Sequence, residues 1–301
     1  MRSDNGHASA SGSSDKRNAA IMYAIAAAAF YALSAPVSKI LLAGMAETIL
    51  AGLLYLGAGI GMLILSGIQK KAKFISSEVP LGRAELKYVV AMVLLDILAP
   101  ILLLVGLRTT AAANVSLLNN FEIVATTLIA SLAFKEHVSK KLGLGIALVT
   151  LATLLLSIHD EGSLSFSMGS ISILLACVCW GLENNCTRMI SSKDTKQIVI
   201  IKGLGSGLGA LGIGLSLGET LPEPGILGIA LSLGFAAYGL SVYFYVKAQR
   251  HLGASKTSAY YAFAPFLGVA LSIAVLHEIP GPSFWIALVI MLIGSRFTNQ
   301  G

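Results

Sequence analysis

Residues 30–39 read Phe-Tyr-Ala-Leu-Ser-Ala-Pro-Val-Ser-Lys, and residues 179–188 read Cys-Trp-Gly-Leu-Glu-Asn-Asn-Cys-Thr-Arg. Each stretch lies at the end of an apolar segment, and the second begins 149 residues after the first. A second pair of segments is offset by 142 residues: Arg108 and Arg250 precede apolar stretches that end at Lys135-Glu136 and His277-Glu278. The chain therefore reads as two related halves.

The composition is that of a membrane protein. Of the 301 residues, 55% are hydrophobic and only 12% are charged, and the mean hydropathy is +0.80. A soluble protein of this length needs far more polar surface. Apolar runs of about 18–25 residues recur, which is the length a helix needs to cross the bilayer. They lack the alternation of a membrane barrel, so we predict an all-α membrane protein.

Breaks rich in Gly, Pro and charge divide the chain into ten transmembrane helices, arranged as two repeats of five. The expected spans are 19–43, 46–66, 86–107, 111–134, 142–158, 168–190, 197–217, 226–247, 254–276 and 283–297. Five is an odd number, so the two repeats, 19–158 and 168–297, have opposite orientations in the membrane and are inverted repeats. Residues 1–18 are polar and are expected to form a disordered cytoplasmic tail.

The positive charges support this count. With the N-terminus in the cytoplasm, 19 Lys and Arg residues fall in or beside inside loops, and only Lys39 and Arg108 lie outside. Both termini are then cytoplasmic, and we expect the bacterial inner membrane. The net charge of +6 is explained by these loops, so nucleic acid is not an expected partner. Cys177, Cys179 and Cys186 lie in one span and are expected to pack as small apolar residues, without a disulfide.

The pattern resembles the drug/metabolite transporter superfamily, specifically proteins with two tandem EamA-type domains. The resemblance rests on the ten-span hydropathy, on Tyr31-Ala32-Leu33 and Trp180-Gly181-Leu182, and on the two matching span ends at 133–136 and 275–278. It covers residues 19–297 and implies a transporter, usually an exporter of metabolites, amino acids or drugs. Small multidrug exporters of this superfamily carry a Glu in the first span. Here Ser34 occupies the position that matches Glu183, so an acidic coupling residue must lie elsewhere.

Ionisable and amide groups inside the membrane are the candidate site residues, because each is costly in hydrocarbon unless it faces a cavity or a partner. Two acid–amide clusters stand near mid-membrane, one per half: Glu122 with Asn119 and Asn120, and Glu183 with Asn184 and Asn185. Helical spacing places Thr187 on the same face as Glu183. A carboxylate in hydrocarbon holds a proton more readily than in water, so either Glu could carry protons. The alternative is that these groups only bond helix to helix.

Further candidates are Asp96, near Pro100 in the third span, and Tyr260, which belongs to an aromatic stretch in register with the fourth span. Lys39 and Arg188 match in the repeat but lie at opposite faces, as paired gates or as interfacial anchors. Gly203 with Gly207, and Gly205 with Gly209, predict close helix packing and not a nucleotide loop. No metal-ligand spacing, cofactor motif or catalytic triad is present in the sequence.

These features favour a secondary transporter that exports a small metabolite, such as an amino acid or a similar amphipathic solute, by alternating access. Proton coupling through Glu122 or Glu183 is a hypothesis. The rival within transport is a facilitative or exchange carrier for an anionic solute that uses Lys39 and Arg188. A membrane-embedded enzyme or a receptor-like scaffold is the rival outside transport. The expected partners are a small solute and the lipid bilayer, and a homodimer remains open.

Overall fold

A computed structural model describes residues 6–71, 79–135, 138–157, 167–252, 257 and 260–298. The described chain is helical, apart from short connections and one isolated bridge between Val79 and Lys193. Its α-helices are α1 (Gly6–Ala32), α2 (Ser34–Leu41), α3 (Glu47–Lys71), α4 (Leu86–Thr109), α5 (Ala112–Leu118), α6 (Phe121–Phe134), α7 (Lys140–Ser157), α8 (Met168–Met189), α9 (Thr195–Ser216), α10 (Pro224–Gly234), α11 (Ser241–Leu252), α13 (Ala264–Leu276) and α14 (Pro282–Thr298).

Seven helical segments in the described part of the chain are long and apolar enough to cross a membrane, and α13 and α14 are shorter apolar helices. The 22-residue helix α8 is not among the seven, and its C-terminal half carries Glu183, Asn184, Asn185 and Arg188. Large apolar side chains face outward along the helices, among them Leu132 at 83% exposure and Leu208 at 63%. Such a surface belongs in lipid.

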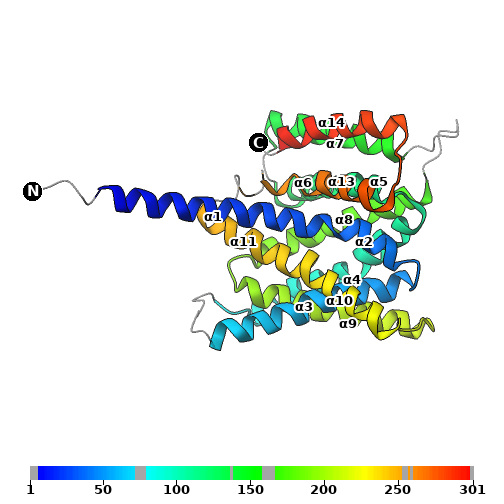
Figure 1. Cartoon of the computed structure of the whole chain (residues 1–301), viewed down its shortest axis with the longest axis horizontal. Coiled ribbons are helices and arrows are strands. Elements are labelled where there is room, and N and C mark those ends of the chain that lie inside the picture. The colour runs from blue at the N-terminus through cyan, green and yellow to red at the C-terminus, as the bar shows by residue number, and fades with distance from the viewer. Residues whose placement is uncertain are drawn as a thin grey trace, which may run out of the picture.

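The N-terminal helix extends beyond the apolar span. Helix α1 already begins at Gly6, and the apolar span itself begins at Asn18. Extending a helix that the membrane span has already nucleated costs little per residue, so a polar extension can stay helical. In Figure 1 this end of α1 projects beyond the body of the molecule. Residues 1–5 lie outside the described part of the chain.

Helices from the two halves pack against each other across the whole molecule. Close pairs are α3 with α9, α4 with α8, α7 with α14, α1 with α11, and α5 with α13. Figure 1 shows α7 and α14 side by side along one edge, with α5, α6 and α13 beneath them and with α3, α9 and α10 along the opposite edge. The buried core is continuous across both halves, and it runs from Leu41 to Met291.

Glycines allow the closest of these approaches, between α3 and α9. A Cβ added at Gly203 would lie 2.4 Å from the backbone nitrogen of Gly59, and one at Gly207 would lie 2.6 Å from that of Leu56. Gly205 and Gly209 instead face α4, where an added Cβ would meet the side chains of Val93 and Ile97. The prediction of close packing at both pairs of small residues is confirmed: Gly203 and Gly207 contact the backbone of α3, and Gly205 and Gly209 contact side chains of α4.

Several helices are interrupted near the middle of the molecule. α1 ends and α2 begins around Leu33, α5 and α6 meet at Asn119-Asn120, and a turn at Ala262-Phe263 precedes α13. A π-helical stretch, η2 (Phe235–Leu240), joins α10 to α11. By contrast, α4 continues through Pro100. Discontinuous helices free backbone polar groups, and membrane proteins tolerate this only where protein or water can satisfy them.

Candidate functional site

Asp96, Glu183 and Lys202 meet in one ionic cluster, which joins α4, α8 and α9. The Lys202 ammonium lies 3.1 Å from Oδ2 of Asp96 and 3.1 Å from Oε2 of Glu183. Both carboxylates are almost completely buried, at 0% and 1% exposure, whereas 26% of the Lys202 side chain is exposed. Helix α9 places the ammonium here because Gly203, the next residue, brings the helix against α3.

The outer oxygens of the two carboxylates have their own donors. Tyr55 of α3 donates its hydroxyl hydrogen to Oδ1 of Asp96 at 3.0 Å, and Trp180 donates its indole N–H to the Tyr55 oxygen at 3.3 Å. Thr187 donates to Oε1 of Glu183, as expected from their spacing on one helix face. A buried ion pair needs such extra hydrogen bonds, because desolvation otherwise exceeds the attraction between the charges.

A second polar contact joins α6 to α8. Asn184 donates to Oε1 of Glu122 at 2.7 Å and to the Thr126 hydroxyl at 3.2 Å, and Asn185 donates to the Thr126 carbonyl at 3.1 Å. The helices approach closely here because Gly181 has no side chain. A Cβ added at this position would lie only 2.8 Å from the Cβ of Ala125. Glu122 and Glu183 therefore contact different partners, and the consecutive residues Glu183 and Asn184 connect the two contacts through α8.

The break between α5 and α6 contains the other predicted amides. Asn119 donates to the Tyr31 hydroxyl at 2.7 Å, while Asn120 bonds locally to the carbonyl of Leu117 at 3.1 Å. The Tyr31 ring packs against Tyr238 and Tyr261, with centroids 6.1 and 5.9 Å apart.

Within the described residues, Tyr261 contributes these ring contacts rather than its neighbour Tyr260, which is half-buried. Tyr238 lies at the centre of this aromatic group. Its hydroxyl is 2.7 Å from that of Ser34, and its ring packs in a tilted arrangement against that of Tyr55, with centroids 5.5 Å apart. The aromatic group thus connects the ionic cluster to the Asn119 break.

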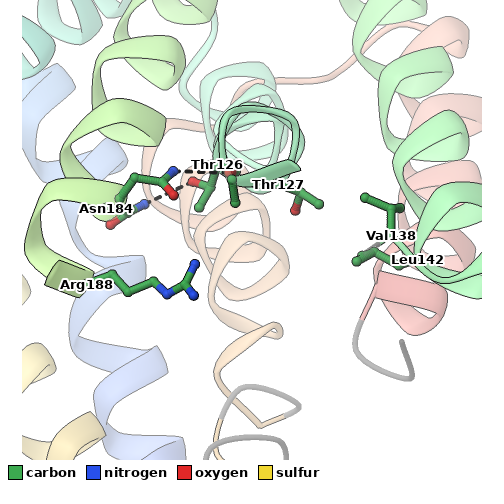
Figure 2. A pocket seen from close by; sticks show the side chains of 8 residues that line it. Thr126, Thr127, Val138, Leu142, Asn184 and Arg188 are labelled. Carbon is green, nitrogen blue, oxygen red and sulfur yellow. Dashed lines mark hydrogen bonds between the residues drawn. The ribbon is translucent and has the colours of Figure 1, made fainter. Parts of the chain in front are cut away.

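A cavity of about 310 Å³ lies beside the Asn184 contact. Figure 2 shows Asn184 bonded to Thr126, with Arg188 one turn farther along α8 and with Val138 and Leu142 across the space. Thr127, Ala130 and Asn185 complete the lining. A second cavity of about 30 Å³, roughly the volume of one water molecule, lies beside Tyr31, Ser34, Asn119 and Gly268.

At the face expected to be outside, charged groups hold helix ends together. Lys39 donates to three backbone carbonyls at the end of α4, those of Leu107, Arg108 and Thr110, at 2.5, 3.1 and 2.9 Å. Arg108 pairs with Glu47 and donates to the Met45 carbonyl. A cation at a helix C-terminus satisfies orphan carbonyls and the helix dipole. Lys39 is thus bound to backbone here, whereas its repeat counterpart Arg188 lines the larger cavity.

The structure brings together Asp96 with Glu183, and Glu122 with Asn184, but it places Asn120 and Tyr260 outside these contacts. Sequence reasoning missed Lys202, which was counted among the inside flanking cations, and it missed Tyr55. The signal for Lys202 was present: a lysine within an apolar span carries the same desolvation cost as the acids.

Comparison with known proteins agrees with this architecture. The model of the EamA-like transporter family matches the chain twice, over residues 18–158 and 167–300. The chain belongs to the EamA-like transporter family. Its two matched segments coincide with the two halves that the sequence offsets separate.

Two relatives of this EamA-like protein are named as transporters. An "Uncharacterized transporter" of Methanothermobacter thermautotrophicus is 29% identical over 240 residues, covering 77% of this chain and 68% of the relative. The "Uncharacterized transporter YyaM" of Bacillus subtilis is 27% identical over 184 residues, which is 58% of this chain and 60% of that protein. A crystal structure with 15% identity shares the fold, with a TM-score of 0.66 over 92% of this chain and 94% of that chain. The protein is thus an integral membrane protein of a transporter family.

Proposed function

We propose that this EamA-like protein is a secondary transporter that exports a small metabolite, such as an amino acid or a similar amphipathic solute, by alternating access. It would comprise ten transmembrane helices in two inverted repeats, residues 19–158 and 168–297. The N-terminal tail and both termini would lie in the cytoplasm of a bacterial cell. The solute would bind between the halves. Coupling to protons would use Glu122 or Glu183.

The helix pairs support a two-fold relation between the repeats. α3 with α9 and α7 with α14 each join equivalent helices of the two halves, and α5 with α13 joins different parts of the equivalent spans 111–134 and 254–276. The pair α1–α11 joins the first span of the first half to the third span of the second half. The pair α4–α8 joins the third span of the first half to the first span of the second half. Lys135 and His277 are also equivalent at the 142-residue offset, and both have left-handed backbones, with φ of 54° and 52°. A two-fold axis in the membrane plane would map each pair onto itself or its mate.

The main support for the proposal is that two cavities at equivalent positions of the repeats differ in volume. Thr126 and Asn184 line the cavity of about 310 Å³. Their counterparts at offsets of 142 and 149 residues, Gly268 and Ala35, line the cavity of about 30 Å³. Alternating access requires this situation, in which one half is open while its symmetry mate is closed. In this mechanism, the contacts of Lys39 and Arg108 would close the outer face, on the side of the smaller cavity.

The lining of the larger cavity supports the solute class. Arg188 supplies a guanidinium suited to a carboxylate. Asn184, Thr126 and Thr127 supply amide and hydroxyl groups, and Ala130, Val138 and Leu142 form an apolar wall. A volume of about 310 Å³ is at the lower end of small-molecule sites. An amphipathic solute with one acidic group fits this combination.

The exchange carrier for an anionic solute remains the second candidate because of Arg188. In that mechanism Lys39 would take the place of Arg188 when the opposite side opens, after releasing the carbonyls of α4. An imposed pH gradient separates the two functions: export coupled to protons responds to the gradient, and simple anion exchange does not.

The experiment compares the solutes released by cells that carry wild-type protein, Thr126→Trp or Leu132→Trp. Both substitutions lie on α6, but Thr126 lines the cavity and Leu132 is 83% exposed on the lipid side. We expect at least one small metabolite to accumulate in the medium with wild type and Leu132→Trp, and not with Thr126→Trp. Identical profiles in all three strains and in cells without the protein would contradict the proposal.

A further inference from the structure

We propose that Asp96, Glu183 and Lys202 form the proton-binding site that couples transport, with one proton shared between two carboxylates that face a single ammonium. This inference rests on the proposed transport function and specifies how it would be driven. It assigns proton coupling to the cluster that contains Glu183 and not to Glu122, which contacts the next residue of α8, Asn184.

The charges of the cluster do not balance. Two carboxylates at 0% and 1% exposure face one lysine, which leaves an excess of one negative charge in a buried region. Within the described residues, the neighbouring titratable groups add no positive charge: they are Tyr55 on α3, Tyr238 on η2, Glu122 on α6 and Cys186 on α8. An unpaired buried charge costs several kcal/mol per ion by usual estimates. Binding one proton removes the excess and leaves one neutral ion pair.

The hydrogen bonds suggest how the proton would enter. Oδ1 of Asp96 and Oε1 of Glu183 are occupied by Tyr55 and Thr187. The other two carboxylate oxygens, Oδ2 of Asp96 and Oε2 of Glu183, both face the Lys202 ammonium at 3.1 Å. A hydronium ion would give its proton to a carboxylate oxygen and leave as water, and one O–H bond would form. The proton is shared between the two acids because both contact the same ammonium.

Protonation would also change which helices the cluster ties together. With both acids ionised, Lys202 binds α9 to α4 through Asp96 and to α8 through Glu183. With one proton shared between the acids, the ammonium faces one negative charge in place of two, and the tie of α9 to α4 and α8 weakens. The next residues of α8, Asn184, Asn185 and Arg188, line the larger cavity. The proton thus acts on the same helix that forms the solute site.

The opposite half has a neutral version of this cluster. At the offset of 149 residues, Ser34 matches Glu183, and at the offset of 142 residues, Tyr238 matches Asp96. These two counterparts are themselves in contact, through a hydrogen bond of 2.7 Å between their hydroxyls. The same position in the two-fold arrangement is therefore a neutral pair on one side and a charged cluster on the other. One coupling site for each chain follows.

Trp180 provides a test that needs no solute. Its indole N–H bonds to Tyr55, which in turn donates to Asp96, so its fluorescence reports on this carboxylate. Trp285→Phe removes the other tryptophan, which is 49% exposed on α14. We expect the emission of Trp180 in the full-length protein to follow a one-proton transition as pH is varied. Asp96→Asn and Glu183→Gln should each abolish it, because one carboxylate then pairs with one ammonium.

Glu223→Gln, at an exposed outer position, and Glu122→Gln serve as matched carboxyl controls and should retain the transition. The infrared band of a protonated carboxylic acid should titrate with the emission, and it is readable even if Trp180 responds weakly. The proposal is overturned if wild type shows no such transition by either method. It is equally overturned if either cluster variant retains the transition, or if Glu122→Gln removes it. Solute release, measured separately, decides the transport function itself.

Discussion

Replacing Gly203 by alanine tests whether the α3–α9 contact positions the ionic cluster. The added Cβ would lie 2.4 Å from the nitrogen of Gly59 and 2.8 Å from the carbonyl oxygen of Tyr55, whereas ordinary contacts begin at 3.4 Å. Both neighbours are backbone atoms and cannot rotate away, so the helices must separate by about 1 Å. Overpacking of this kind costs about 1–3 kcal/mol, and it would displace Lys202 from its two carboxylates.

Thermal unfolding in detergent measures this effect, and Gly212→Ala is the matched control. Gly212 lies on the same helix, but an added Cβ there meets nothing within 4 Å. Alanine is the better helix former, so Gly212→Ala should be neutral or slightly stabilising. We expect Gly203→Ala to lower Tm by a few degrees and to weaken the Trp180 transition described above. Equal Tm values for the two variants would refute the reasoning.

Three other variants test the polar contacts. Lys202→Met should cost about 3–5 kcal/mol of unfolding free energy, because it strands two buried carboxylates; an unchanged Tm would show that the ion pairs contribute nothing. Tyr55→Phe should cost about 1.5–3 kcal/mol through the lost hydrogen bond to a charged group and should shift Trp180 emission, and no shift would contradict the Trp180–Tyr55 bond. In a double-mutant cycle, Asn184→Leu with Glu122→Leu should cost less than the sum of the singles by about 0.5–3 kcal/mol; strict additivity would argue against this contact.

Much of the helical framework was predictable from the sequence. Apolar length and Gly-Pro breaks gave spans such as 168–190 and 197–217, which the structure has as α8 (Met168–Met189) and α9 (Thr195–Ser216). Close packing at the small-residue pairs of α9 was also predicted correctly, and at Gly203 and Gly207 glycine permits contact between backbones. Helix interruptions were harder to predict. The break at Asn119-Asn120 depends on the Asn119 bond to Tyr31, which is 88 residues away in the chain.

The site was predictable in its residue types but not in its pairings. Glu122, Glu183 and Asp96 were identified from the cost of burying an acid, yet the sequence does not specify which helices meet. The ammonium partner of Glu183 comes from α9, and the contact of Glu122 on α8 is Asn184. Lys202 is placed by the approach of α9 to α3, a tertiary contact. Ser34 was correctly marked as the neutral counterpart of Glu183, but its partner Tyr238 required the structure.

Two pairs of spin labels, measured in the same lipid bilayer, test alternating access most directly. One pair, at Val138 and Arg188, reports on the mouth of the larger cavity, and the other, at Ile40 and Ile279, reports on the opposite face, where these side chains are 51% and 94% exposed. We predict that each pair has two distance populations, and that they change in opposite directions as the pH is moved between about 5 and 8. Distances that stay single and fixed at both faces would contradict the account.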